Sequence, residues 1–375
     1  MTDPATDLRA IAFYLPQFHP VPENDEWWGK GFTEWTNVTK ALPLIPGHQQ
    51  PHLPADLGFY DLRLPQARAA QAELAQAYGI HGFCYYHYWF NGRRILERPF
   101  NEVLASGKPD LPFMLCWANE NWTRVWDGSS RHVLLEQKYG ADDDVAHLRS
   151  LLPAFRDERY IRIDGKPVFL VYRTGLLPEP AATADRWRQV AHEAGLTGLY
   201  LVRVESHGDE HDPLSIGFDA AVEFAPFNGL QRQLFRGPAD RWLARLGLRP
   251  RATQRHNFYD YADVARVMSE RQTPSFPRFH CVTPGWDNSA RRKENATVLL
   301  GADPDIYGRW LGHVAERTRD RFAPGQRLCF VNAWNEWAEG NHLEPDRRCQ
   351  RAYLEATKRA LAAHGGALSS GAKRQ

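Results

Sequence analysis

Short apolar runs alternate along the chain with longer stretches that have helical periodicity. The apolar runs are rich in β-branched and aromatic residues, which is typical of buried strands. They predict eight strands, at 11–15, 80–86, 112–117, 167–172, 199–204, 219–224, 278–283 and 328–333. The periodic stretches predict helices at 64–78, 94–105, 142–152, 183–194, 259–271, 304–319 and 353–364. This alternation predicts an α/β fold with a single (β/α)8 TIM-type barrel and long strand-to-helix loops.

Polar and aromatic residues follow almost every predicted strand. In a (β/α)8 barrel, the carboxyl ends of all strands open onto one face, and the active site lies there. An open doubly wound sheet also alternates strand and helix, but its ligand sits at a single switch point. The spread of such residues over the strand ends therefore favours the barrel. The candidate binding residues at these ends are Gln17, His19, Tyr86, His87, Tyr88, Trp117, Asn119, Glu120, Trp122, Glu223, Trp286 and Asp287.

The last predicted strand leads into the segment with the clearest chemistry. Residues 327–346 read RLCFVNAWNEWAEGNHLEPD, so an apolar run turns polar at once. In a turn just past the strand, Glu336 and Glu339 can both point into one pocket. Paired carboxylates suit glycosidic-bond chemistry, where one acid protonates the leaving oxygen and the other assists at the sugar ring. An ordinary solvated loop is the alternative, and the further candidate binding residues here are Trp334, Asn335, Trp337 and His342.

A long segment rich in Pro, Gly and Trp, residues 20–60, follows the first strand. Loops of this length inside a compact domain are usually functional. We expect the segment to form a wall over the pocket, and the alternative is a structural cap packed by its own aromatic rings. The candidate contacts are Trp27, Trp28, Glu34, Trp35 and His52.

Residues 228–256 interrupt the alternation of strand and helix. This stretch holds seven arginines and one acidic residue, Asp240. A basic, partly amphipathic insertion of this kind can contact an anionic membrane or a lipid-linked glycan, and a solvated variable insertion is the alternative. Residues 365–375 are rich in Gly, Ser, Lys and Arg and are expected to form a disordered tail, which leaves 1–364 as the barrel domain.

The composition narrows the functional class. A net charge of +1 argues against a nucleic-acid partner, whereas 13 Trp and an aromatic content of 12% favour a glycan, because aromatic rings stack on sugars. The first residues lack the basic and apolar regions of a signal peptide, and no stretch has the length of a membrane span. Cys84, Cys116, Cys281 and Cys329 fall in predicted strands, as reduced core thiols would. We therefore expect a cytoplasmic protein, with peripheral attachment to the inner membrane left open.

Motifs for bound cofactors are weak or absent. No dinucleotide-binding or P-loop glycine pattern occurs, and no Gly-x-Ser-x-Gly elbow supports a serine nucleophile. Asp142, Asp143 and Asp144 resemble the acidic triplet of metal-dependent nucleotide-sugar transferases, but at a helix start they suit the helix dipole. Residues 207–212, HGDEHD, could ligate a metal, although they lack a recognisable spacing. We expect no metal and no cofactor.

Six longer motifs together resemble a known family. They are FYLPQFHP from Phe13, WWGKGFTEWTNV from Trp27, PHLPADLGFYDL from Pro51, GFCYYHYWF from Gly82, LCWANENWTRVWDG from Leu115 and NAWNEWAEGNHLEPD from Asn332. The chain resembles the WbsX-like family, a glycoside hydrolase family 99-like group met in bacterial surface-polysaccharide gene clusters. The resemblance runs from about Ile11 to Glu355 and is weakest over the arginine-rich insertion.

The resemblance implies a (β/α)8 barrel related to the endo-α-mannosidases, which are retaining enzymes that need no metal. Their Asn-Glu-Trp-His-Glu-Gly motif matches residues 335–340, where Ala338 replaces the histidine. By this match, Glu336 would deprotonate the sugar 2-hydroxyl to give a 1,2-anhydro intermediate. Glu339 would protonate the leaving oxygen and then activate water.

We therefore expect an endo-acting, α-mannosidase-like retaining glycoside hydrolase that cleaves an α-linked glycan of bacterial surface polysaccharide. Two alternatives stay open. One is a glycosyltransferase or transglycosylase of lipopolysaccharide or capsule biosynthesis, and the other is a non-catalytic glycan-binding barrel. Retention of both Glu336 and Glu339 favours an enzyme over a binding protein.

Overall fold

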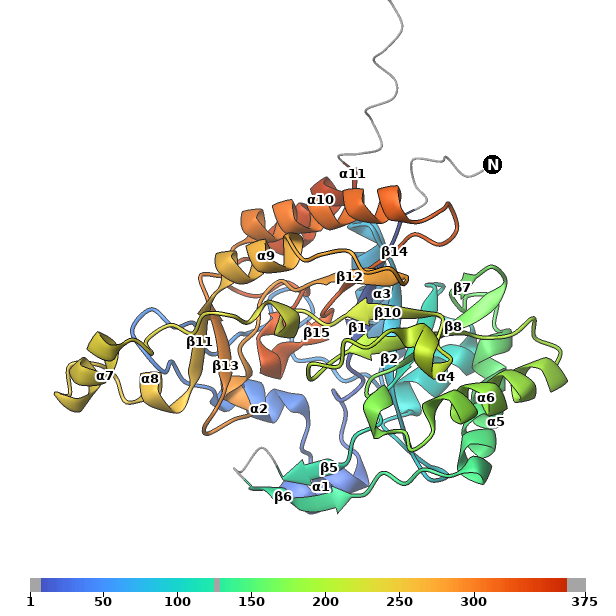
Figure 1. The fold of residues 1–375 in the computed structure, drawn as a ribbon. Helices are drawn as coiled ribbons and strands as arrows, with labels where there is room; N and C mark the ends of the chain where they lie inside the picture. The colour runs from blue at the N-terminus through green and yellow to red at the C-terminus, as the bar shows by residue number, and fades with distance from the viewer. Residues whose placement is uncertain (1–7, 125–128, 363–375) are drawn as a thin grey trace, which may run out of the picture.

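The computed structural model describes residues 8–124 and 129–362. Within them, eight parallel strands form one closed ring (Figure 1). Each strand pairs with the next, and β1 pairs with both β14 and β2, which closes the barrel. The predicted (β/α)8 fold is therefore confirmed. The strands are β1 (Arg9–Tyr14), β2 (Ile80–Phe90), β4 (Phe113–Trp117), β8 (Lys166–Val171), β9 (Tyr200–Glu205), β10 (Ala220–Glu223), β12 (Arg278–Val282) and β14 (Leu328–Val331).

Helices cover the outside of the ring. In α10, the buried residues Tyr307, Trp310, Leu311 and Val314 recur at helical spacing and face the strands. Asp303 begins this helix, since its carboxylate accepts hydrogen bonds from the backbone of the first turn. The helices of the ring are α3 (Pro65–Ala77), α4 (Arg98–Ser106), α5 (Ala141–Arg156), α6 (Pro180–Glu193), α9 (Tyr261–Ser269), α10 (Pro304–Arg321) and α11 (Ala352–Ala362).

The local structure differs from the prediction in several places. The helix predicted at 94–105 begins at Arg98, and Arg93–Ile95 form strand β3, which pairs antiparallel with β2. The segment 20–60 contains two short helices, α1 (Pro22–Trp28) and α2 (Glu34–Lys40), which its Gly and Pro content concealed. The helix predicted at 259–271 begins at Tyr261, because Asp260 caps it and the preceding residues form β11 (Asn257–Asp260). Strand β11 pairs with β13 (Thr297–Leu300), a partner distant in sequence that a local pattern does not reveal.

The barrel core is apolar and tightly packed. Phe13 lies against Phe224 and Phe330, with ring centroids 5.8 and 5.6 Å apart. The four strand cysteines, Cys84, Cys116, Cys281 and Cys329, are buried and form no disulfide, as the sequence predicted. Packing of this kind makes the barrel interior a rigid base on which the loops are built.

Most of the additional helices and strands outside the ring are inserted after the carboxyl ends of the barrel strands. In Figure 1, helix α1 and the hairpin of β5 (Trp122–Arg124) and β6 (Ser129–Leu135) lie at the bottom, α2 lies at the lower left and the β11–β13 pair lies on the left. Helices α10 and α11 lie on the opposite, upper side. The elements that can enclose a substrate therefore gather at one end of the barrel, as expected for this fold.

Residues 228–256 form an arm that projects from this end, on the left of Figure 1. It contains α7 (Pro238–Arg245) and α8 (Ala252–Arg255). Over the described residues, no helix combines the length and apolar character required to span a bilayer. The tail predicted at 365–375 lies outside the described residues.

Candidate active site

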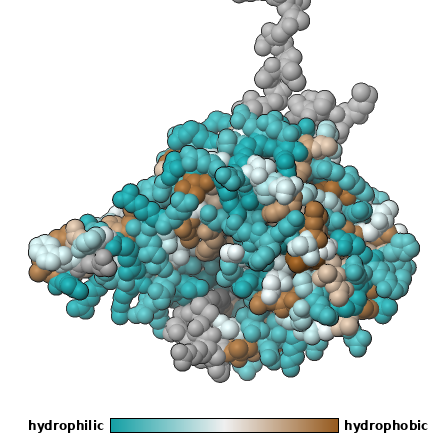
Figure 2. Space-filling model, viewed as in Figure 1, coloured by the Kyte–Doolittle hydropathy of each residue, from teal (hydrophilic) through white to brown (hydrophobic). Residues whose placement is uncertain are grey.

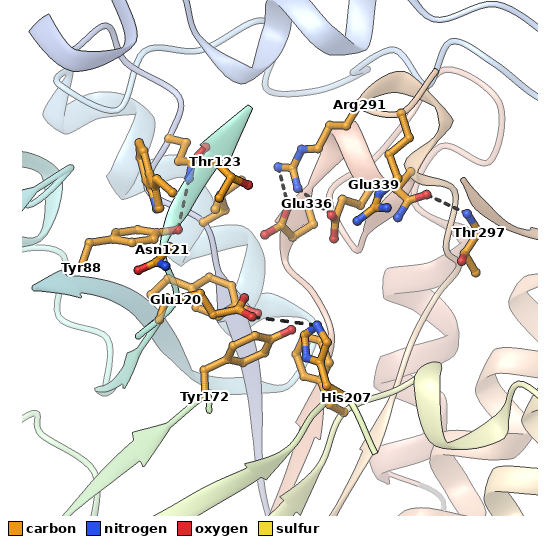
Figure 3. Close-up of a pocket in the computed structure, with 18 of the residues that line it drawn as sticks. Tyr88, Glu120, Asn121, Thr123, Tyr172, His207, Arg291, Thr297, Glu336 and Glu339 are labelled. Atoms are coloured by element: carbon orange, nitrogen blue, oxygen red, sulfur yellow. Dashed lines mark hydrogen bonds and ion pairs between the residues drawn. The ribbon is translucent and has the colours of Figure 1, made fainter. Parts of the chain in front are cut away.

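The carboxyl ends of the strands surround a cleft of about 510 Å³. This volume lies in the usual range for small-molecule sites. Figure 3 shows Glu336, Glu339 and Arg291 on one side of the cleft and Glu120, Tyr172 and His207 on the other. The lining residues are Leu15, Gln17, Trp28, Tyr86, Tyr88, Ala118, Glu120, Asn121, Trp122, Thr123, Leu134, Tyr172, His207, Phe224, Phe227, Trp286, Asn288, Arg291, Arg292, Asn295, Thr297, Glu336 and Glu339.

A small hairpin after β14 carries the two glutamates. Strands β15 (Asn335–Glu336) and β16 (Asn341–His342) pair antiparallel and are joined by the 3₁₀ turn Trp337–Glu339. Asn335 fixes the hairpin to the end of β1, because its side chain binds both the backbone N–H and the carbonyl of Leu15. The two carboxylates thus leave a strand end that is held in place on both sides.

Gly340 and Glu344 make this hairpin possible. Gly340 has a φ of 56°, and a Cβ there would come within 2.9 Å of the Asp287 side chain. Glu344 is buried and accepts hydrogen bonds from Tyr60, Gln71 and the indole of Trp337. Burial raises the pKa of Glu344 to about 7, although these hydrogen bonds lower it. Glu344 therefore fixes the turn of the hairpin to the residues behind the cleft.

One guanidinium joins three carboxylates at the cleft. Arg291 Nη1 lies 2.7 Å from Glu339 Oε1, and Nη2 lies 3.1 Å from Glu336 Oε2 (Figure 3). The same Nη2 lies 2.9 Å from Glu34 Oε2, on helix α2 behind the cleft wall. Arg291 therefore fixes the position of both hairpin glutamates and supplies their counter-charge.

Glu336 holds its proton unusually tightly. Burial raises its pKa to about 8, Arg291 lowers it, and the neighbouring Glu339 and Glu34 raise it again. Tyr86 and Tyr88 line the cleft, where burial raises their pKa values and the nearby charge of Glu336 raises them further. An acid that titrates near neutrality in a substrate-sized cleft is typical of a group that transfers protons.

The opposite wall carries a second set of polar groups. Glu120 is paired with Arg173, and His207 Nε2 lies 3.9 Å from Glu120 Oε1. Burial lowers the pKa of His207, which favours the neutral ring, while Glu120 opposes this effect. Tyr172 is buried near Glu120 and Glu339, whose charges add to the effect of burial in raising its pKa. This wall presents hydrogen-bonding groups to whatever the cleft binds.

Aromatic rings form the remaining walls. The rings of Trp286 and Phe227 meet edge to face, with centroids 4.8 Å apart. On the other side, Trp122 packs against Tyr88 at 5.4 Å and against Trp27 at 5.7 Å. Rings held in this way offer flat apolar faces beside hydrogen-bonding groups, a combination that suits sugars.

The structure brings part of the predicted set of binding residues into the cleft. Those that line it, together with the two glutamates, are Gln17, Trp28, Tyr86, Tyr88, Glu120, Trp122 and Trp286. His87 and Trp117 lie instead against His147 of helix α5. Alternate residues of a strand point to opposite faces, which explains why His87 is turned away between two cleft tyrosines.

Other predicted residues support the cleft from behind. Glu34 holds Arg291, Trp27 packs on Trp122, and Asn335 locks the hairpin. Asn119 binds the backbone of Arg173, and so positions the loop after β4. None of these four side chains lines the cleft.

The remaining predicted residues serve packing or ion pairs away from the cleft. Trp35, Trp334, Trp337 and His19 are buried. Asp287 lies 2.6 Å from His48 Nε2, and Glu223 lies 3.1 Å from His280 Nδ1. His52 and His342 line a separate cavity of about 140 Å³.

Metal-binding geometry occurs once among the described residues. Ligand atoms of His52, His342 and Asp346 lie within 4.8 Å of one another, outside the main cleft. The two imidazole rings are already 3.0 Å apart at His52 Nδ1 and His342 Nε2, a distance that a hydrogen bond between neutral rings explains. In the 207–212 stretch, Asp209 and Glu210 pair with arginines.

Several cleft residues escaped the sequence analysis. Tyr172 ends one predicted strand and His207 closely follows another, so the strand-end pattern could have identified them. The loop after β12 contributes a larger group with no recognisable motif. It comprises Asn288, Arg291, Arg292 and Asn295, and Thr297 at the start of β13 lies beside them in the cleft lining.

Comparison with known proteins identifies the family. The family described as Glycosyltransferase WbsX matches residues 10–357. The chain belongs to this family. Two relatives of this WbsX-family protein are both called "Uncharacterized protein WxcX", from Xanthomonas campestris pv. campestris strains B100 and ATCC 33913. Each is 46% identical over 360 residues, which cover 96% of this chain and 50% of the relative.

Solved structures similar to this WbsX-family protein are glycoside hydrolases or resemble them. A "Glycoside hydrolase-like protein" has a TM-score of 0.57 at 15% identity, covering 95% of this chain and 94% of its own. The GH99 endo-alpha-mannosidase from Bacteroides thetaiotaomicron has a TM-score of 0.56 at 14% identity, covering 95% and 97%. At this identity the similarity shows the fold, which agrees with the predicted relation to family 99. The chain spans about half the length of the WxcX relatives.

Proposed function

We propose that this protein is a retaining, endo-acting glycoside hydrolase of the α-mannosidase type that cleaves an α-linked glycan of bacterial surface polysaccharide. The observation that carries the proposal is the pair Glu336 and Glu339, held by one guanidinium in a cleft walled by aromatic rings. The fold and the family are those of carbohydrate-active proteins. The cytoplasmic location expected from the sequence stays a prediction.

In the first step, Glu336 takes the proton of the sugar 2-hydroxyl as its oxygen attacks the anomeric carbon. The glycosidic bond breaks, and the leaving oxygen receives a proton from Glu339. In the second step, water attacks the anomeric carbon of the 1,2-anhydro sugar and gives a proton to Glu339. Glu336 returns its proton to the 2-oxygen, so both acids regain their starting states.

Arg291 has a defined part in this scheme. A base must be ionised to act, and burial favours the protonated form of Glu336. The guanidinium at 3.1 Å opposes burial and keeps the ionised form accessible near neutral pH. Because the pKa of Glu336 is about 8, kcat/KM is expected to rise with pH up to about that value. A rate that falls over this range would assign the acid role to Glu336.

The family description favours a second candidate function, in which the same site acts as a glycosyltransferase. In that case, a sugar hydroxyl instead of water would attack the 1,2-anhydro sugar, and the roles of both glutamates would be unchanged. Turnover in ¹⁸O-labelled water with an oligosaccharide acceptor present separates the two reactions. Hydrolysis places the label in the new reducing end, whereas transfer yields an unlabelled, longer glycan.

The test of the acid pair uses aryl α-disaccharides with good and poor leaving groups. Glu339→Gln should reduce turnover of the poor leaving group by roughly 10²–10⁴-fold and spare more activity on the good one, which needs little protonation. Glu336→Gln should slow the first step on both, since it acts at the sugar ring.

Two outcomes oppose the proposal. Wild-type rates in both variants, on a confirmed substrate, would place the catalytic groups elsewhere. Glycan binding without turnover by the wild-type protein would favour a binding barrel.

A further inference from the structure

The arm at 228–256 carries a strong excess of positive charge. Its seven arginines and one aspartate give a formal charge of 7 − 1 = +6, although the whole chain has only +1. Arg249 pairs with the single acid, Asp240, and Arg255 pairs with Glu294. Arg245 and Arg251 are exposed and form no ion pair with any described carboxylate. The arm therefore presents unneutralised guanidinium groups to solvent.

Large apolar side chains lie beside these arginines at the free end of the arm. Trp242 is 59% exposed, Leu246 is 53% exposed and Leu248 is 67% exposed. Leu246 caps the C-terminus of α7 and its backbone N–H bonds to the carbonyl of Trp242, four residues earlier, so the two residues lie on the same side of the helix end. Figure 2 shows apolar and neutral residues at the tip of the arm, on the left, with hydrophilic surface behind them.

The base of the arm is firmly attached to the barrel loops. Leu234 forms a bridge with Phe258 of β11, and Phe258 is buried against Val298 of β13. The Arg249 guanidinium lies over the Phe235 ring, 5.2 Å from its centroid. The arm is therefore a supported projection whose exposed apolar tip has no partner within the described chain.

We propose that this arm docks the protein on an anionic lipid bilayer. Trp242, Leu246 and Leu248 enter the interfacial region, and the exposed arginines bind lipid phosphate groups. Interfacial helices combine these features, with Trp or Leu on one face and basic residues at the polar boundary. An apolar protein partner would bury the tip equally well, but it would leave unexplained Arg245 and Arg251, which have no carboxylate partner among the described residues.

Docking through the arm also orients the cleft. Strand β11, at the base of the arm, pairs with β13, where Asn257 lies opposite Thr297. Thr297 lines the cleft. The membrane anchor and the substrate site are therefore built on one pair of strands, so docking holds the cleft entrance near the membrane surface. This inference does not depend on the chemistry assigned to Glu336 and Glu339.

The experiment is flotation of the full chain with vesicles of phosphatidylcholine alone or with phosphatidylglycerol. Binding is expected only to the anionic vesicles, and it should weaken as salt rises from about 50 to 500 mM, because added ions screen the arginines. Replacing both Arg245 and Arg251 with Gln should lower the partition coefficient about 25-fold, at roughly fivefold for each charge near the surface. Trp242→Ser should lower it roughly tenfold.

Matched variants outside the arm control for general effects. Leu214 is 58% exposed, so Leu214→Ser removes a comparable apolar side chain from another part of the surface. Arg309→Gln with Arg359→Gln removes two exposed charges from α10 and α11. Neither control should change vesicle binding by more than about twofold. Circular dichroism confirms that each variant is folded.

Three results would overturn the inference. They are equal binding to neutral and anionic vesicles, no binding to either, or an equal loss of binding in arm variants and controls. Light scattering after size-exclusion chromatography tests the alternative that a second copy of this chain covers the apolar tip of the arm. A dimer that Trp242→Ser converts to monomer, without vesicle binding by the wild type, would assign the tip to a second copy of this chain.

Discussion

Replacing Arg291 with Met tests the electrostatic design of the site. The change removes a guanidinium that contacts Glu34, Glu336 and Glu339, while a side chain of similar length still fills the space. Arg291 and Glu34 are almost entirely shielded from water, with side chains 11% and 0% exposed. Removing one partner of such a buried pair usually costs about 3–5 kcal/mol, because the remaining charges lose their counter-charge.

The loss in the free energy of unfolding should depend on pH, and the number of protons bound by the folded and unfolded states decides whether it grows or shrinks as the pH rises. Without the guanidinium, the carboxylates relieve their repulsion by binding protons in the folded state, and Glu336 already has a pKa of about 8. The folded variant then binds more protons than its unfolded chain above about pH 4.5, so its free energy of unfolding falls as the pH rises. We expect a loss of about 1–2 kcal/mol at pH 5 and about 3–5 kcal/mol at pH 8.

Urea unfolding at pH 5, 6.5 and 8, followed by tryptophan fluorescence, measures this difference. Arg266→Met is the control, because Arg266 is exposed and its ion pairs within the described chain are with the surface acids Asp263 and Glu270. It should change the free energy of unfolding by less than about 1 kcal/mol at every pH. A loss for Arg291→Met that is equal at all three pH values would refute the reasoning. Such a result would mean that the three carboxylates do not interact through this guanidinium.

Two further predictions concern binding and stability. Trp286→Ala should raise KM for a soluble glycan about tenfold through loss of an aromatic wall, and the exposed Trp242→Ser should leave KM unchanged. Asp287→Asn should lower the free energy of unfolding at pH 7 by about 1–3 kcal/mol, because Asp287 accepts bonds from the side chains of His48 and Gln50. Burial alone would raise the pKa of Asp287, but His48 holds it below its usual value. The stability that Asp287 contributes is therefore present above about pH 4 and lost below it, so unfolding at pH 7 and pH 3.5 should show the difference shrink in acid.

The sequence by itself determined the architecture of the barrel. The barrel strands are buried on both faces, so most of them read as nearly continuous apolar runs that stand out between amphipathic helices, although β9, β10 and β12 also bury Arg203, Glu223 and His280. It also located the hairpin with Glu336 and Glu339, because polar residues directly after an apolar strand have few places to lie except the open end of the barrel. These features depend on neighbours in the chain, so local pattern suffices.

Tertiary structure alone decided which strand-end side chains enter the cleft. His87 lies between Tyr86 and Tyr88, and all three are polar aromatic residues that follow the same apolar run. The pleat of β2 turns the two tyrosines into the cleft and His87 toward helix α5. A sequence pattern gives the alternation of sides, but only barrel closure sets which side faces the cleft.

The sequence also could not predict the cluster of Arg291 with Glu34, Glu336 and Glu339. Arg291 lies in the loop after β12, Glu34 in helix α2, and the other two glutamates in the hairpin after β14. These segments meet because β12 and β14 are neighbours in the ring and β14 pairs with β1, from which the chain leads into α2. Nothing in the loop after β12 distinguishes Arg291 from a solvated arginine, since its burial and its partners are created by contacts between residues up to 257 positions apart in the chain, from Glu34 to Arg291.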